Sequence, residues 1–80
     1  MEVKSERKMV VGAKQLRKAL SKGLVSQVLL ARNADPAITE PIEALCIKDN
    51  VTCTWIGAKQ ELGRICGIEV GAAAAAYLKQ

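Results

Sequence analysis

Hydrophobic side chains recur at helical spacing from Gly12 to Lys22, the first clearly patterned stretch of this 80-residue chain. At about 100° per residue, one side of this stretch carries the apolar residues Ala13, Leu16 and Leu20. The opposite arc carries the polar residues Lys14, Gln15 and Lys18. Gly23 then supplies the left-handed residue that commonly ends a helix. The pattern predicts a first helix with one face toward the core and one basic face.

Short extended stretches and further helical ones follow. The run 25–31 is rich in β-branched and aliphatic residues, which is typical of a strand buried on both faces. Residues 33–36 predict a turn, because Asx residues and proline favour turn geometry. A second helix is expected to begin near Pro41, since proline is tolerated at the first helical position. It would end at Asn50 and bury Ile42, Leu45 and Cys46.

The C-terminal third continues this alternation. Residues 51–56 form a strand signature, in which threonines alternate with the apolar residues Val51, Cys53 and Trp55. Residues 57–60 open a third helix, which Gly67 closes. The tail 72–78 begins with five alanines and stays open, because alanine has the highest helix propensity but this run is short and has no polar face. Strands alternating with helices predict an α/β fold, a three-layer α/β/α sandwich around a small mixed β-sheet.

Composition limits the classes of protein that fit. Eighty residues make one domain, 1–80, whose polar residues 1–7 are expected to fray. Half of the residues are hydrophobic, which argues against disorder, and the lack of Phe requires an aliphatic core. The apolar run between Glu69 and Lys79 is too short to cross a bilayer, and the charged N-terminus does not resemble a signal peptide. We therefore expect no membrane partner. We also expect a cytoplasmic protein that is a monomer.

The sequence offers little for catalysis or metal binding. There is no histidine, and the three cysteines form no Cys-x-x-Cys pair, so they are interpreted as buried free thiols and no metal is expected. No histidine is available as a general base, and the cysteines lack a basic partner that would make them nucleophiles. The acidic residues form no recognisable pair, and no phosphate-loop motif is present. We expect neither catalysis nor a cofactor. The net charge of +4 is a modest excess that suggests a polyanionic partner but is also common among ordinary small proteins.

Two glycine-led basic segments are the candidate sites. A glycine before a basic amphipathic stretch indicates a helix N-terminus, where free backbone N–H groups can meet phosphate. The first segment offers Gly12, Lys14, Gln15 and Lys18, although periodicity alone favours an ordinary solvated helix face. The second segment, 59–71, ends in a loop with Ile68, Glu69 and Val70, whose apolar members fit a core position equally well. Candidates for contacts to a nucleic-acid backbone are Arg7, Lys8, Lys59 and Arg64.

Together the two segments resemble the L-seven-Ae family of kink-turn RNA-binding ribosomal proteins, most closely its small bacterial YbxF-type members, from Lys8 to Leu78. The resemblance implies that the alanine-rich tail is a strand and that the turn 32–36 is structural. In the family the first segment is typically Gly-x-Asn-Glu-x-x-Lys, whose polar residues read the tandem sheared G·A pairs of the kink-turn. Gly12 and Lys18 match, while Lys14 and Gln15 stand at the Asn and Glu positions, as in the YbxF-type subset. Gln15 can still accept a hydrogen bond through its carbonyl, but a lysine can only donate.

For the second segment, the resemblance implies that the loop covers the nucleotide extruded from the three-nucleotide bulge. Ile68 and Val70 would contact that base, which suits RNA because a splayed base offers an apolar face that a duplex hides. Glu69 would accept from a base or a 2′-OH, or else make a local cap or ion pair. The function predicted is recognition of kink-turns in structured RNA, such as rRNA or a regulatory mRNA element. The alternatives are a structural ribosomal protein that holds rRNA and a small protein–protein adaptor.

Overall fold

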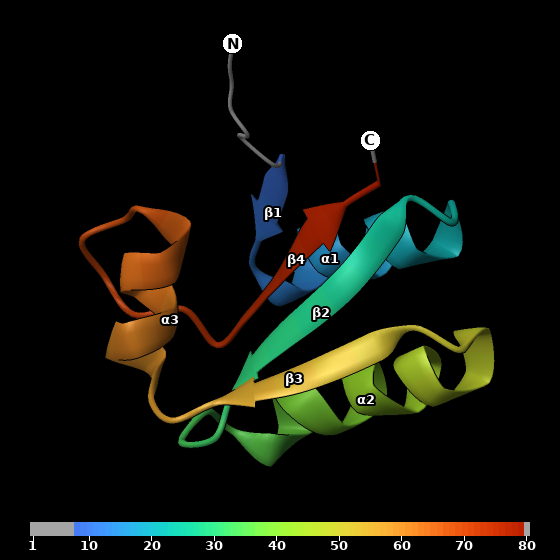
Figure 1. The fold of residues 1–80 in the computed structure, drawn as a ribbon. Helices are drawn as coiled ribbons and strands as arrows, with labels where there is room; N and C mark the ends of the chain where they lie inside the picture. The colour runs from blue at the N-terminus through green and yellow to red at the C-terminus, as the bar shows by residue number, and fades with distance from the viewer. Residues whose placement is uncertain (1–7, 80) are drawn as a thin grey trace, which may run out of the picture.

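Three helices and four strands make up the computed structural model, which describes residues 8–79 (Figure 1). In chain order they are β1 (Met9–Val11), α1 (Ala13–Ser21), β2 (Val25–Ala31), α2 (Pro36–Asp49), β3 (Thr52–Ile56), α3 (Lys59–Cys66) and β4 (Ala74–Leu78). The sheet order is β1-β4-β2-β3. β2 and β3 are parallel, whereas β4 is antiparallel to both of its neighbours. The predicted fraying of residues 1–7 lies outside the described residues.

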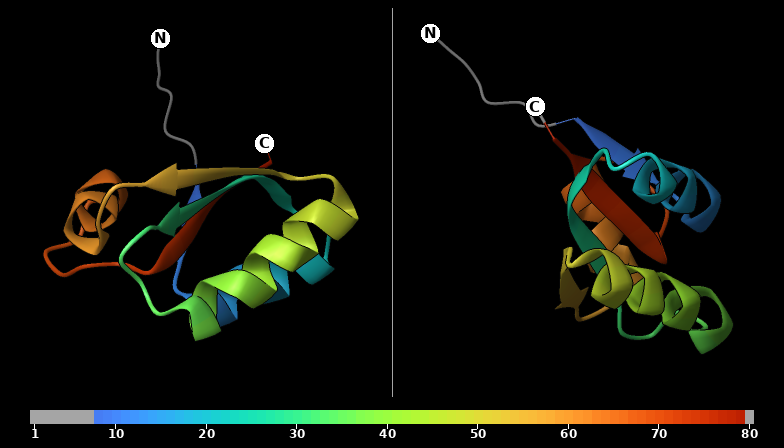
Figure 2. Two further views of the ribbon diagram at one scale, coloured as in Figure 1. Left: turned by 90° about the horizontal axis from the view of Figure 1, so that it is seen from below. Right: turned by 90° about the vertical axis from the view of Figure 1, so that its right-hand side faces the viewer.

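The helices cover the two faces of the sheet unequally (Figure 2). On one face, α1 and α2 enclose a cluster that includes Leu16, Leu20, Val28 and Ile42. On the other, a smaller cluster forms around Leu62 of α3, which stands at one end of the sheet. The predicted α/β fold with a small mixed sheet is therefore confirmed.

The alanine-rich tail is a central strand, as the resemblance implied. Ala74, Ala75 and Ala76 are completely buried between β1 and β2. Ala74 and Ala76 belong to the cluster under α1 and α2, and Ala75 belongs to the cluster on the opposite face. Because their side chains are small, larger residues from both layers can pack against this strand. Tertiary packing thus overrides the helix propensity of alanine, which is only a weak preference.

The predicted start of the second helix, near Pro41, is wrong. The helix begins at Pro36, where the Asp35 carboxylate accepts a hydrogen bond from the N–H of Ala37 at 2.9 Å. An Asp cap followed by proline at the first position is a strong helix start, so the helix begins at the first proline and not at the second. Pro41 lies inside the helix and leaves the carbonyl of the exposed Ala37 without its usual partner. The helix ends at Asn50 in left-handed conformation (φ 59°), as predicted.

The first helix agrees with the hydrophobic pattern. Leu16 and Leu20 are buried, while Lys14, Gln15 and Lys18 are exposed. Gly23 has φ +70° and donates to the Leu20 carbonyl, and the N–H of Leu24 donates to the Ala19 carbonyl, which together close the helix as a Schellman motif. The short strand β1 was not predicted, because three residues are too few for a periodic pattern. Only its pairing with β4 defines it.

Candidate nucleic-acid interface

The two glycine-led segments meet at one end of the sheet. The N–H of Gly12 donates to the Ala74 carbonyl at 2.9 Å, and the N–H of Ala72 donates to the Lys59 carbonyl at 3.0 Å. The start of α1 and the start of α3 are therefore joined through the short link that leads into β4. The sequence suggested two candidate segments, and the fold makes them neighbours.

At the start of α1 the backbone is open to a partner. Gly12 has φ +101°, a conformation that favours glycine, and it has no side chain to cap the helix. The N–H groups of the first turn are thus available to an acceptor outside the helix. Lys14 and Gln15 are exposed beside them, and Lys18 is exposed one turn further along. This end of α1 offers several hydrogen-bond donors, together with the Gln15 carbonyl as an acceptor.

The loop 67–71 follows α3 and folds back against it. The N–H of Ile68 donates to the Gly63 carbonyl at 3.0 Å, and Gly67 adopts a left-handed conformation with φ +77°. Ile68 is half-buried against the cluster around Leu62, whereas Val70 is 69% exposed. The two apolar loop residues, which the sequence treats alike, therefore differ: one belongs partly to the core and the other faces solvent.

Gly63 allows this loop to lie directly on the backbone of α3. It is buried, and a Cβ atom placed on it would overlap the carbonyl oxygen of Val70 and lie 3.1 Å from the carbonyl carbon. At Gly71, a Cβ would lie 3.0 Å from the Cβ of Lys59. Sequence reasoning missed the role of Gly63. A signal existed, since glycine inside a helix costs about 1 kcal/mol relative to alanine and so requires a packing reason.

The turn that precedes α2 fixes the start of α3. Ala58, the N-cap residue of α3, has no side chain that could accept a hydrogen bond. The Asn33 side-chain oxygen instead accepts from the N–H of Lys59 at 2.8 Å. Asn33 and Asp35 thus cap two different helices, which confirms the structural role assigned to this turn.

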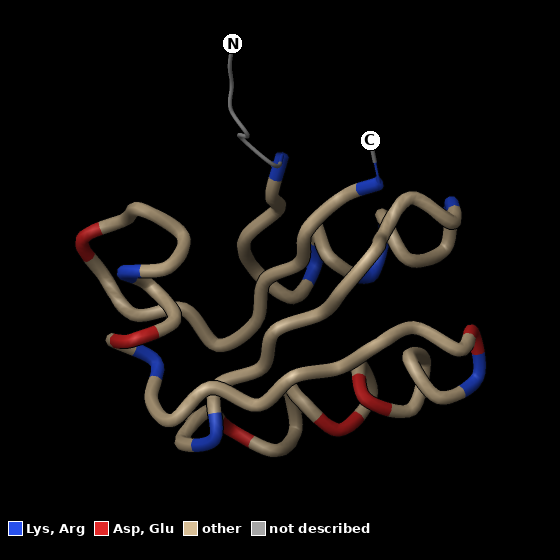
Figure 3. The backbone as a smooth tube through the Cα atoms, viewed as in Figure 1, with Lys and Arg blue, Asp and Glu red and all other residues tan. Residues whose placement is uncertain are grey.

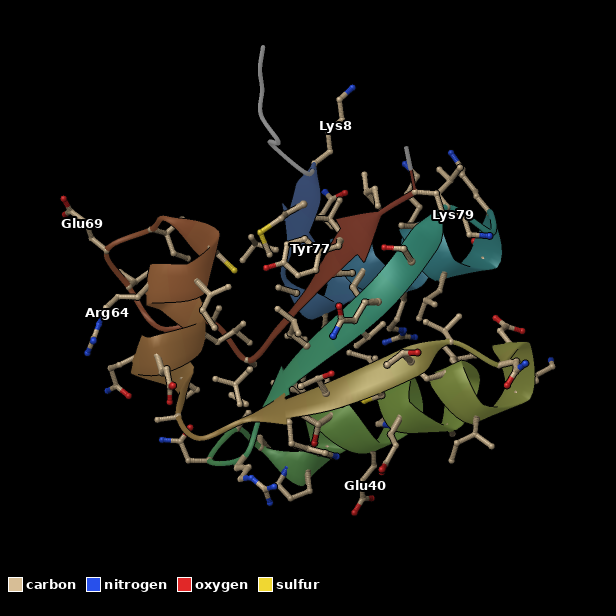
Figure 4. All side chains as sticks on the ribbon, viewed as in Figure 1. Lys8, Glu40, Arg64, Glu69, Tyr77 and Lys79 are labelled. Carbon is tan, nitrogen blue, oxygen red and sulfur yellow. The ribbon has the colours of Figure 1, made fainter. Side chains whose placement is uncertain are left out.

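The remaining polar candidates lie on and beside α3. Lys59, Arg64 and Glu69 are all exposed, and Figure 4 displays Arg64 and Glu69 pointing away from the body of the protein. Arg64 is in the last turn of α3, close in sequence to the loop, and Lys59 is in the first turn. Lys8, the residue before β1, lies at the opposite end of the sheet from this loop, and Arg7 is outside the described residues.

Charge is distributed unevenly along the chain (Figure 3). Residues 8–34, which form β1, α1 and β2, contain six basic residues and no acidic ones. Residues 35–69, which contain α2 and α3, hold six acidic residues and three basic ones. The basic residues of the first segment are Lys8, Lys14, Arg17, Lys18, Lys22 and Arg32. The positive face of the protein is therefore the α1 side, and the exposed face of α2 is acidic.

The cysteines do not form a reactive site. Cys46 is buried, Cys53 and Cys66 are half-buried, and all three are free thiols. Burial, helped by the adjacent Cys53, raises the pKa of Cys46 to about 12. Burial also raises the pKa of Cys53 and of Cys66. Thiols that stay protonated at neutral pH are poor nucleophiles and poor metal ligands. Between Lys8 and Lys79, no group of three acidic or cysteine side chains is arranged to hold a metal, and no helix is long and apolar enough to cross a bilayer.

Comparison with known proteins places the chain in a family. The model of the ribosomal protein L7Ae/L30e/S12e/Gadd45 family matches residues 1–80. The chain belongs to this family. It is 44% identical over 69 residues to RNA-binding protein TTE2299 of Caldanaerobacter subterraneus, covering 86% of this chain and 84% of that protein. It is 40% identical over 72 residues to RNA-binding protein YbxF of Geobacillus stearothermophilus, covering 90% and 88%.

The L7Ae-family fold is also found among solved structures. The Giardia lamblia 15.5kD RNA binding protein superimposes with a TM-score of 0.84 at 30% sequence identity, over 90% of this chain. This chain spans 61% of the length of that protein. The family resemblance read from Gly12, Lys18 and the loop 67–71 is thus confirmed, including its YbxF-type branch.

Proposed function

We propose that this L7Ae-family protein binds RNA and recognises kink-turns. The observation that carries the proposal is the junction of the two basic segments. The open N-terminus of α1 and the loop 67–71 lie at the same end of the sheet, linked through Gly12–Ala74 and Ala72–Lys59 hydrogen bonds. Two further observations support it: the bacterial relatives are named as RNA-binding proteins, and the α1 side of the molecule is basic.

The start of α1 would read the tandem G·A pairs. Its free N–H groups and Lys18 suit phosphate and base acceptors, and Gln15 can both accept and donate at a base edge. Lys14 supplies donors where many family members carry asparagine. These side chains are exposed, so RNA can reach them without displacing another part of the protein.

The loop would contact the extruded nucleotide of the bulge. Val70 is the side chain best exposed for covering an unstacked base, and Ile68 would add its exposed edge from a half-buried position. Glu69 would accept from a base or a 2′-OH. Lys59 and Arg64 would contact phosphates near the loop, which positions the RNA without reading its sequence. We expect one monomer to act on one kink-turn, without catalysis.

The test is binding to matched RNAs. One RNA carries a kink-turn, and in the second both G·A pairs are replaced by Watson–Crick pairs in stems of equal length. We expect the replacement to weaken binding by several kcal/mol, since each base-specific set of contacts is worth roughly 1–3 kcal/mol. Equal affinity for the two RNAs would refute kink-turn recognition while leaving general RNA binding possible.

A further inference from the structure

A row of lysines runs the whole length of α1, beyond the part assigned to the G·A pairs. Lys14, Lys18 and Lys22 are spaced four residues apart, so about 6 Å of helix rise separates each from the next and all lie on one face. All three are exposed. The first two belong to the proposed kink-turn site, but Lys22 is the C-cap residue of α1, at the end far from Gly12.

Two more lysines adjoin the far end of this row. The N–H of Leu78 donates to the Lys8 carbonyl at 2.8 Å, and the N–H of Lys79 donates to the Leu24 carbonyl at 2.7 Å. The ends of β1 and β4 are thereby held against the turn that follows α1. In Figure 4, Lys8 and Lys79 both point outward at this end of the sheet. We call Lys8, Lys18, Lys22 and Lys79 the basic edge.

The surface enclosed by the basic edge is concave and free of negative charge. A shallow hollow of about 160 Å³ lies between α1 and the β1–β4 side of the sheet. Its lining residues are Val10, Gln15, Lys18, Ala19, Lys22, Leu24 and Leu78. None of the elements that form it, β1, α1 and β4, contains an acidic residue. A polyanion lying here would meet no opposing carboxylate from these elements.

We propose that the basic edge binds the phosphate backbone of the RNA stem that continues past the G·A pairs. The proposal rests on kink-turn recognition, which would place the stem with the G·A pairs at the start of α1. The row of lysines then leads away from that point along the helix. Lys22 stands eight residues after Lys14, so the row spans about 12 Å along α1. Lysine suits this role, since it is a flexible point charge that attracts phosphate without reading base edges.

The experiment compares two kink-turn RNAs and two single variants. In the short RNA, the stem with the G·A pairs is capped by a tetraloop directly after them; in the long RNA, the same stem continues as regular duplex. Lys22→Gln removes a charge from the basic edge. Lys48→Gln is the matched control, because Lys48 is also an exposed lysine near the C-terminal end of a helix, but on the acidic α2.

We expect the wild-type protein to bind the long RNA several-fold more tightly than the short RNA. Lys22→Gln should reduce that gain, and Lys22→Gln combined with Lys79→Gln should reduce it further, while affinity for the short RNA stays unchanged. For the long RNA, the slope of log K against log salt should become shallower by about 0.7–0.9 for each phosphate that the variant no longer neutralises. Lys48→Gln should change none of these values.

Two results would overturn the proposal: equal affinity of the wild type for both RNAs, or an undiminished gain in the double variant. Either leaves kink-turn recognition standing if the short RNA is still bound specifically. If neither RNA is bound more tightly than its counterpart with Watson–Crick pairs in place of the G·A pairs, the proposed function itself fails, so the two failures can be told apart.

Discussion

Replacing Gly63 by alanine tests how the fold holds the loop 67–71 in place. The added Cβ would overlap the carbonyl oxygen of Val70, a backbone atom that cannot rotate away. On helix propensity alone, alanine would stabilise α3 by about 1 kcal/mol. Overpacking a tight site costs about 1–3 kcal/mol, so we expect a net loss of about 1 kcal/mol in the free energy of unfolding. The loop must also move off α3, which displaces Val70.

The assay pairs chemical denaturation with kink-turn affinity measured under conditions where the variant is fully folded. We expect Gly63→Ala to weaken RNA binding by at least about 1 kcal/mol, the lower end for one base-specific set of contacts. Gly57→Ala is the control, because a Cβ there would meet only the end of the Glu61 side chain, at 3.0 Å, which can rotate away. If Gly63→Ala stabilises the protein and binds RNA normally, the packing argument is refuted.

Four further outcomes follow from the structure. Gln15→Ala with Lys18→Ala should weaken kink-turn binding with an unchanged melting temperature, because both side chains are exposed; full affinity would remove α1 from the site. Val70→Asp should weaken binding without loss of stability, since Val70 is 69% exposed, and an unfolded variant would contradict this. Asn33→Ala should lower the free energy of unfolding by about 1 kcal/mol through loss of the α3 cap, as chemical denaturation would measure. Burial raises the pKa of the Cys46 thiol from 9.0 to about 12, so above pH 9 this thiol ionises in the unfolded state but not in the folded state. The free energy of unfolding should therefore fall as pH rises above 9. Denaturation measured across this pH range should show a smaller fall for Cys46→Ala.

Much of the fold can be predicted from the sequence, because the spacing of hydrophobic residues that marks a helix or a strand is visible within a short stretch of chain. The buried side of α1, the glycine that ends it and the strand β2 all agree with the pattern of hydrophobic positions. The predicted start of α2 was wrong because two prolines, Pro36 and Pro41, could each mark the first turn of the helix. The helix begins at Pro36 because the Asp35 carboxylate accepts a hydrogen bond from the N–H of Ala37 and so caps the first turn.

Other features depend on partners far away in the chain. Ala74 to Ala76 form a strand only because β1 and β2 flank them, and no local preference reveals this. The burial of Ile68 and the exposure of Val70 differ because the loop turns back on Gly63, a contact that neither residue type predicts. The sequence identified the residues of the candidate site but not their arrangement, since their meeting depends on hydrogen bonds that join α1, α3 and β4.

The central claim is that the start of α1 reads the tandem G·A pairs. Affinities of the wild type and the Gln15→Ala, Lys18→Ala variant, each measured with the kink-turn RNA and with its Watson–Crick counterpart, test this directly. We predict that the preference for G·A pairs shrinks in the variant by roughly 1–3 kcal/mol, the coupling expected when one base-specific set of interactions is removed. A preference of unchanged size in the folded variant would contradict the account.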